Sequence, residues 1–182
     1  MSKISVDLSV KGIEKLKRYL LDYKSDLNSK LKIFVNEVAK LGIPVIETKI
    51  AEANYTYDED NIQSGSDTTH KTYINLVSSG DYAEATLIVE GEEILFIEFG
   101  AGVSYNTPKG TSPHELGSQY KFLIGTYGKG YGARQIWGYY DDGGELVLTR
   151  GTKATMPMWE AKKVIRNSEN VISIARKVFG GN

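Results

Sequence analysis

The stretch from Ile94 to Gly102 constrains the fold of this chain more than any other. It is the most apolar run in the sequence, it contains one carboxylate at Glu98, and it ends in a Gly-Ala-Gly break. Glu92 and Glu93 precede it, and acidic side chains are favourable at the positive end of a helix dipole. We therefore predict a short, largely buried helix here, while a core strand of this length is also compatible with the pattern.

A helical pattern occupies much of the N-terminal half. Apolar residues recur every three or four positions from residue 12 to residue 41, which predicts either one long helix or a helical hairpin broken near Ser25 and Asp26. Pro44 interrupts the pattern, and we expect a kinked helix that resumes and ends near Ala53. One small sheet is not expected to cover the whole stripe, so part of it is expected to face another copy of the protein.

Strand patterns occur in three places before the apolar run. Polar and apolar residues alternate over Ile4–Val10, which is the period of a half-buried strand. Residues 73–77 and 85–89 are rich in β-branched and aromatic side chains and flank the turn signal Ser78–Asp81, which predicts an antiparallel pair. Ile62 is placed in a further short strand.

The C-terminal region predicts one amphipathic helix of about six turns. Pro157 suits its first turn, the apolar residues share one face, and Gly180 and Gly181 end it. Together these elements predict an α+β fold in a single domain, residues 1–182. A small antiparallel sheet, made of the N-terminal strand, the antiparallel pair and residues 145–150, packs with the long N-terminal helices and the C-terminal helix.

Residues 101–150 are predicted to form an extended loop or hairpin arm inserted before the last helix. Eleven of the nineteen glycines lie between residues 100 and 144, and loops this long are uncommon in compact domains unless they are functional or disordered. Residues 135–140 and 145–150 flank Asp141–Gly144, which is a hairpin signal. The arm also contains many aromatic residues, which we expect to pack against another molecule. These predicted interface residues are Tyr105, Tyr120, Tyr127, Tyr131, Trp137, Tyr139 and Tyr140.

Composition limits the classes of function. The formal net charge is −1, so no strong basic field attracts nucleic acid or an anionic membrane. The chain has no cysteine, which excludes disulfides and thiolate metal ligands. It contains neither an apolar run long enough to span a membrane nor the apolar segment of a secretory signal. We therefore expect a soluble intracellular protein.

Two motifs for ligand binding are incomplete. Gly125–Gly132 is rich in glycine, but a phosphate-binding loop requires Ser or Thr after its lysine, and Lys129 is followed by Gly130. His114-Glu115 matches the first half of the zinc motif H-E-x-x-H, but the position of the second histidine is Ser118. We therefore assign no cofactor and no metal ion.

Glu98 is the remaining candidate for chemistry. Its apolar neighbours suit a general acid, but catalysis requires a positioned partner, and no Asp, His or Lys lies at helical spacing on the same face. A buried carboxylate is more often paired than catalytic. We therefore expect Glu98 to accept hydrogen bonds from backbone N–H groups or from arginine and to fix the glycine turn that follows it.

The order of these pieces resembles a known family. The pattern of strand, long helices and small sheet is followed by four stretches: F-I-E-F-G-A-G-V at Phe96–Val103, a glycine- and tyrosine-rich insertion at Gly125–Gly132, W-G-Y-Y at Trp137–Tyr140, and G-T-x-A-x-M-P-M within Gly151–Ala161. This combination resembles the neck and tail-completion proteins of long-tailed bacteriophages, also described as head–tail joining or minor tail proteins. Most of the chain takes part in the match, with residues 54–69 divergent.

The resemblance implies a structural subunit of the virion and not an enzyme. Such proteins assemble at the head-proximal end of the tail, commonly as a hexameric ring, where they terminate the tail tube and join it to the connector below the capsid portal. The implied partners are further copies of the chain, the tail tube protein and the head-connector or stopper protein, with sheath or terminator proteins in contractile tails. No membrane and no specific nucleic acid is implied. The structural motif residues are Glu98, Phe99, Gly100, Gly102, Pro157 and Trp159.

Two other functions stay open at this point. The tyrosines of the arm, together with Lys121, Lys129 and Arg134, are of the types that bind single-stranded nucleic acid, although acidic neighbours offset this sparse positive charge. A hydrolase would use Glu98 with His114.

Overall fold

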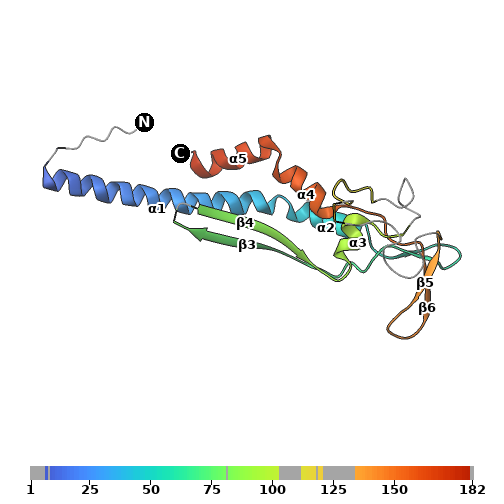
Figure 1. The fold of residues 1–182 in the computed structure, drawn as a ribbon. Helices are drawn as coiled ribbons and strands as arrows, with labels where there is room; N and C mark the ends of the chain where they lie inside the picture. The colour runs from blue at the N-terminus through green and yellow to red at the C-terminus, as the bar shows by residue number, and fades with distance from the viewer. Residues whose placement is uncertain are drawn as a thin grey trace.

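Helix α1 (Val10–Lys40) is the longest element and gives the molecule its elongated shape (Figure 1). The computed structural model describes residues 7, 9–80, 82–102, 112–117, 119–120 and 134–180. The Ser9 side chain caps α1 by accepting the N–H of Gly12 at 3.1 Å. The stripe is therefore one continuous helix, and no break occurs at Ser25. The predicted strand is wrong at Val10, which begins the helix, while residues 1–6 and 8 lie outside the described residues.

The interruption expected near Pro44 is present, but it divides the pattern into two helices instead of kinking one. Helix α2 (Ile43–Ala51) follows α1 after a turn at Leu41 and Gly42, and Pro44 stands in its first turn. Ile46 and Ile50 of α2 are fully buried. The second helix therefore contributes to the core, whereas most of α1 remains at the surface.

The strands form two separate sheets and not the single sheet that the sequence predicts. One is the predicted antiparallel pair, β3 (Lys71–Ser79) with β4 (Tyr82–Glu90), which lies along α1 (Figure 1). The other has the order β1-β2-β6-β5, with β2 and β6 parallel and the remaining neighbours antiparallel. Its strands are β1 (Thr56–Tyr57), β2 (Gln63–Ser64), β5 (Trp137–Tyr140) and β6 (Leu146–Thr149). Ile62 precedes β2 and is not part of it.

The core lies where three helices meet one end of the β3–β4 pair. The predicted short helix is α3 (Ile94–Phe99), which excludes the alternative of a core strand. Buried apolar side chains of α2 and α3 meet Ala161 here, with Leu87 and Val89 of β4 packed against them. The buried members of this cluster are Ile46, Ile50, Ala53, Ile94, Ile97 and Ala161.

The C-terminal region forms two helices, so the prediction of one six-turn helix is wrong. Helix α4 (Pro157–Ile165) packs against α2, and α5 (Ser168–Phe179) packs against α1. Asn167 separates them because its Oδ1 atom accepts the N–H groups of Glu169 and Asn170 at 3.0 and 3.2 Å. This is an N-cap, which begins a new helix in a new direction.

The hairpin predicted near the end of the arm is confirmed as β5–β6, and it belongs to a folded sheet. Residue Thr149 of β6 pairs with Gln63 of β2. The Arg150 guanidinium donates to Asp58 Oδ2 at 2.7 Å, and this contact holds the pKa of the Asp58 carboxyl below its usual value. The hairpin is thus fixed at the end of the molecule opposite the start of α1 (Figure 1). Among the described residues, no helix combines the length and apolarity needed to cross a bilayer.

Candidate functional site

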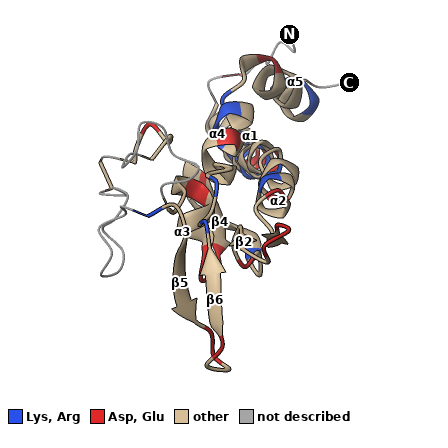
Figure 2. Ribbon diagram, turned by 90° about the vertical axis from the view of Figure 1, so that its right-hand side faces the viewer, with Lys and Arg blue, Asp and Glu red and all other residues tan. Residues whose placement is uncertain are grey.

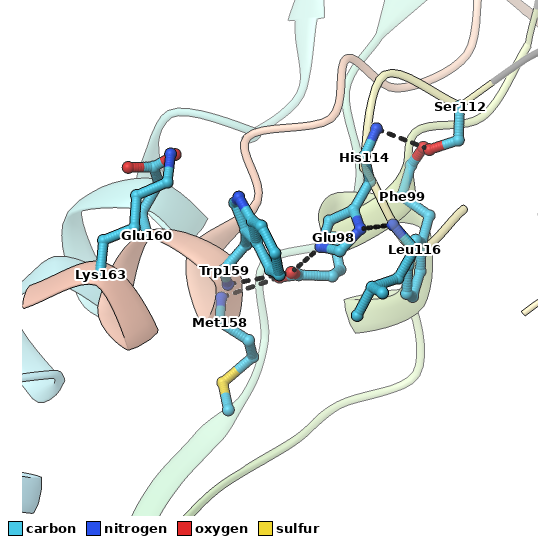
Figure 3. A network of polar contacts seen from close by, with 9 residues as sticks. All are labelled: Glu98, Phe99, Ser112, His114, Leu116, Met158, Trp159, Glu160 and Lys163. Atoms are coloured by element: carbon cyan, nitrogen blue, oxygen red, sulfur yellow. Dashed lines mark hydrogen bonds and ion pairs between the residues drawn. The ribbon is translucent and has the colours of Figure 1, made fainter. Parts of the chain in front are cut away.

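Glu98 is the centre of a buried cluster of polar contacts (Figure 3). It lies on α3 and is only 6% exposed. Its Oε2 accepts the N–H of Met158 at 2.8 Å, and its Oε1 accepts the N–H of Trp159 at 3.0 Å. Oε1 also lies 2.9 Å from His114 Nε2. The expected backbone hydrogen bonds are therefore present, but they fix the start of α4 instead of the glycine turn after α3.

Helix α4 requires this carboxylate because its own N-terminal residues cannot supply a cap. Met156 stands at the N-cap position with φ +56°, in the left-handed region, and its thioether makes no capping hydrogen bond. Pro157 follows and has no N–H group. The next two N–H groups belong to Met158 and Trp159, which are the two that Glu98 accepts. A neighbouring helix thus provides the cap, and its negative charge lies at the positive end of the α4 dipole.

His114 is the third partner of this cluster and is 4% exposed. Its Nδ1 accepts the N–H of Leu116 at 2.9 Å, so Nδ1 bears no proton in this arrangement and Nε2–H donates to Glu98. The ring packs between Phe99, at 4.6 Å between centroids, and Trp159, at 5.0 Å in an edge-on arrangement. Both ring nitrogens are thus engaged within the protein.

Further contacts attach the segment around His114 to α3. Ser112 Oγ donates to the carbonyl of Phe99 and accepts the N–H of His114 at 3.2 Å. The ring of Tyr120 lies 5.8 Å from the ring of Phe99. Residues 112–117 and 119–120 therefore lie against α3. Among the described residues of this segment, only His114 forms a buried contact with a carboxylate, that of Glu98.

The Gly-Ala-Gly break joins α3 to the segment between β6 and α4. Gly100 and Gly102 have φ values of +81° and +80°, which glycine adopts more readily than other residues. The Gly100 N–H donates to Phe96 O at 2.8 Å and ends the helix. Ala101 and Thr152 then exchange two backbone hydrogen bonds of 2.9 Å each. These two bonds join the segment after α3 to the segment before α4, in addition to the bonds that Glu98 accepts.

The predicted structural motif residues therefore lie in one place. Glu98 and Phe99 contact His114, the two glycines make the turn, Pro157 opens α4 and is fully buried, and Trp159 donates to Glu98. From the sequence, Glu98 was paired with His114 only in the hydrolase alternative, and the hydrogen bond between the two side chains spans sixteen positions of sequence. We call this cluster the Glu98 junction.

The predicted interface aromatics are divided between two places. Trp137, Tyr139 and Tyr140 lie together on β5, whereas Tyr120 lies at the Glu98 junction. Tyr139 is half-buried, and its hydroxyl donates to Gln63 Oε1 at 2.9 Å. Burial raises the pKa of this hydroxyl. Tyr105, Tyr127 and Tyr131 lie outside the described residues.

Sequence reasoning missed two leucines that share a face with Tyr140. Tyr140 is paired across the hairpin with Leu146, and Gly138 with Leu148, so these side chains point to the same side of the sheet. All three apolar side chains are exposed. The alternation of Leu146, Val147 and Leu148 was the available signal, but the strand was predicted only from the hairpin turn at Asp141–Gly144.

The arrangement at the Glu98 junction is suited to holding two elements together. The carboxylate receives three donors, and neither nitrogen of His114 faces solvent or an unoccupied cleft. No group of three or more potential metal ligands occurs in the parts of the chain that the structure describes. Comparisons with protein-family models, with curated proteins and with solved structures found no match.

Proposed function

We propose that this chain is a structural subunit of the neck of a long-tailed phage or of a related tail-like particle, where it completes the tail and joins it to the head connector. The proposal rests on the sequence resemblance described above. In this proposal, copies of the chain form a ring, with six copies as in the family that the chain resembles. Its partners are the tail tube protein on one side and the head-connector or stopper protein on the other.

One structural observation supports this proposal above the others. Three of the four stretches that carry the resemblance, although far apart in sequence, are neighbours in the fold. The F-I-E-F-G-A-G run supplies Glu98, and the Gly151–Ala161 stretch supplies the N–H groups that Glu98 accepts. The Trp137–Tyr140 strand pairs with β6, which leads directly into the G-T segment that pairs with Ala101. Residues that fold into one unit are a more specific match than the same motifs scattered over a surface.

The surface of the molecule also favours an assembly subunit. Large apolar side chains are exposed on the N-terminal half of α1 and on β5–β6, at opposite ends of the molecule. Exposed apolar surface of this kind marks contact sites for other proteins. The Glu98 junction, in contrast, satisfies its polar groups internally, so it serves the fold of the subunit in this proposal.

Deletion of the gene from the phage genome, or from the gene cluster of the tail-like particle, tests the function. Disruption of its gene should give filled heads and separate tails in negative-stain electron microscopy, and the wild-type gene supplied in trans should restore joined particles. Normal numbers of joined particles without the protein would contradict the proposal. Binding of labelled single-stranded DNA or RNA at low salt, where phosphate contacts are strongest, would favour the nucleic-acid alternative instead.

A further inference from the structure

Two apolar surfaces at opposite ends of the molecule point to a contact between copies of the chain. The first, which we call the helix stripe, lies on the N-terminal half of α1, the start of which extends beyond α5 and beyond the turn of β3–β4 (Figure 1). It consists of Ile13, Leu16, Leu20, Tyr23 and Leu27, spaced by three or four residues. Ile13 and Leu20 are both 54% exposed.

The second surface is the outward face of the β5–β6 hairpin, which we call the hairpin face. It consists of Tyr140, Leu146 and Leu148, which the register of the two strands places on one side. Tyr140 is 73% exposed and Leu146 is 58% exposed. A tyrosine beside two leucines is of the composition that interface cores favour.

The charges around the two surfaces are opposite. Residues 135–149 contain three acidic side chains, Asp141, Asp142 and Glu145, and no basic one. They gather at the turn of the hairpin (Figure 2). Residues 10–24 of α1 contain five basic and two acidic side chains. Lys17 and Lys24 lie seven residues apart, and helical spacing places both along one side of the helix stripe.

The stripe also offers a concave seat. Tyr23, Leu27 and Leu31 line a groove with Phe179, at the end of α5, and its volume is about 390 Å³. A cavity of about 150 Å³ is enough for a benzene ring. The groove is therefore large enough to receive the side chain of an aromatic residue such as Tyr140.

We propose that copies of this chain associate head to tail, with the hairpin face of one copy packed on the helix stripe of the next. A copy cannot place its own hairpin on its own stripe, because α1 is about 46 Å long and the two surfaces lie at its opposite ends. The acidic turn lies against Lys17 and Lys24 of the neighbour, and Tyr140 lies in the neighbour's groove.

Such a contact joins two different surfaces and therefore builds a ring or an open filament instead of an isolated dimer. Closure into a ring rests on the function proposed above, whereas the contact itself rests on the exposed apolar residues and their charges. The inference thus names the surfaces that hold neighbouring subunits of the ring together.

Charge reversal of each surface tests the contact. The helix variant is Lys17→Glu with Lys24→Glu, and the turn variant is Asp142→Lys with Glu145→Lys. Asp141 is left unchanged because its Oδ1 accepts the Glu145 N–H at 2.8 Å within the turn. Sedimentation of the purified full chain should show oligomers for the wild type, and each variant alone should weaken association about tenfold or more, because like charges then face one another.

An equimolar mixture of the two variants should recover assembly. In the mixture the unchanged turn of one variant meets the unchanged helix of the other, and the two reversed surfaces also complement one another. The control is Lys11→Glu with Arg18→Glu, which makes the same change of charge on the side of α1 away from the stripe. It should leave the sedimentation profile unchanged, and circular dichroism should show that all variants are folded.

Three results would overturn the inference. They are a wild-type protein that stays monomeric at every concentration, a turn variant that associates like the wild type, and a mixture that stays dissociated. An effect of the helix variant alone would indicate a symmetric helix-to-helix contact. These outcomes are independent of the gene-disruption experiment. If the purified chain forms oligomers through these surfaces but heads and tails join normally without the protein, the proposed function is refuted and the proposed contact is retained.

Discussion

Two histidine–glutamate pairs in this molecule show how burial and neighbours decide what the same two side chains do. At the Glu98 junction, His114 is buried, its Nδ1 accepts a backbone N–H, and its Nε2–H donates to the carboxylate at 2.9 Å. His70, near the surface, has Nδ1 at 2.6 Å from the carbonyl of Thr68 and Nε2 at 2.9 Å from Glu47. The first ring combines a donor with an acceptor, whereas both nitrogens of the second face acceptors.

The difference separates a contact that one ring proton satisfies from a contact that requires two. His114 needs no second proton to satisfy its neighbours, and Glu98 also caps a helix, so removal of either leaves buried groups without partners. His70 satisfies both of its neighbours only when it is protonated. The predictions that follow test this contrast, beginning with the largest expected effect.

Replacement of Glu98 by alanine should be the most destabilising of these substitutions. It leaves the N–H groups of Met158 and Trp159 and the Nε2–H of His114 without their acceptor in a buried place. Each unsatisfied buried group costs about 1–3 kcal/mol, so for three groups we expect a total loss of at least about 3 kcal/mol. Chemical denaturation of the wild type and of Glu98→Ala measures it.

Glu160→Gln is the matched control for this prediction. Glu160 lies on the same helix, but its ion pair with Lys163 at 2.6 Å is at the surface. Surface pairs contribute up to about 1 kcal/mol, and many contribute nothing measurable. Equal effects of the two substitutions would show that the capping bonds of Glu98 do not stabilise the fold.

Replacement of His114 by alanine should have the next largest effect, about 2 kcal/mol, because one donor to Glu98 and the packing of the ring are lost while the helix cap remains. The segment that includes Leu116 should also open more often. Hydrogen exchange at the Leu116 amide, which His114 Nδ1 accepts in the wild type, reports this directly. The exposed neighbour Glu115→Ala should leave that amide protected, and unchanged exchange in His114→Ala would contradict the assigned role.

Much of the fold could be predicted because its signals are local. The stripe over residues 12–41, the turn after Ser79 and the hairpin around Asp141 each reveal their structure within a short window of sequence. The C-terminal helix was predicted as one because its apolar pattern continues through Asn167. Asn167, which divides the predicted helix into α4 and α5, is a recognised capping residue, but a single asparagine is a weaker signal than a periodic apolar face.

The Glu98 junction could be predicted only in part because its contacts are not local. The sequence indicated that Glu98 accepts backbone hydrogen bonds, but it offered no means of finding that the donors are Met158 and Trp159, sixty residues away. His114 was considered as half of a metal motif and as the partner of Glu98 in a hydrolase, but its role beside a helix cap has no fixed spacing in sequence. The division of the strands into two sheets likewise depends on the pairing of Gln63 with Thr149, which no short pattern predicts.

The helix caps extend the comparison to a smaller effect. Helix α4 borrows its cap from Glu98, whereas α5 has its own in Asn167. Asn167→Ala should therefore cost only about 1 kcal/mol, the usual value for loss of an N-cap, and Asn167→Asp should cost less because it keeps the acceptor. Thermal unfolding measures both, with the exposed mid-helix Ser173→Ala as control. A loss of stability as large as that of Glu98→Ala would contradict the expectation that an exposed cap contributes less than a buried one.

The smallest effect should be a dependence of stability on pH that belongs to His70. The carbonyl of Thr68 and then the Glu47 carboxylate favour the protonated ring, so the pKa of His70 is raised in the folded protein above its ordinary value of 6.5. A raised folded-state pKa gives stability that is complete below the unfolded pKa and is lost as the pH rises through the folded pKa.

The difference in unfolding free energy between the wild type and His70→Gln isolates this contribution, because the two proteins differ only at residue 70. We expect a difference of about 0.5 kcal/mol or less, as for other contacts near the surface, that favours the wild type at about pH 5.5 and shrinks towards about pH 8.5. A difference that grows with pH would mean that the folded protein prefers the unprotonated His70 ring. The proposed contrast between the two histidine–glutamate pairs would then be wrong for the His70–Glu47 pair.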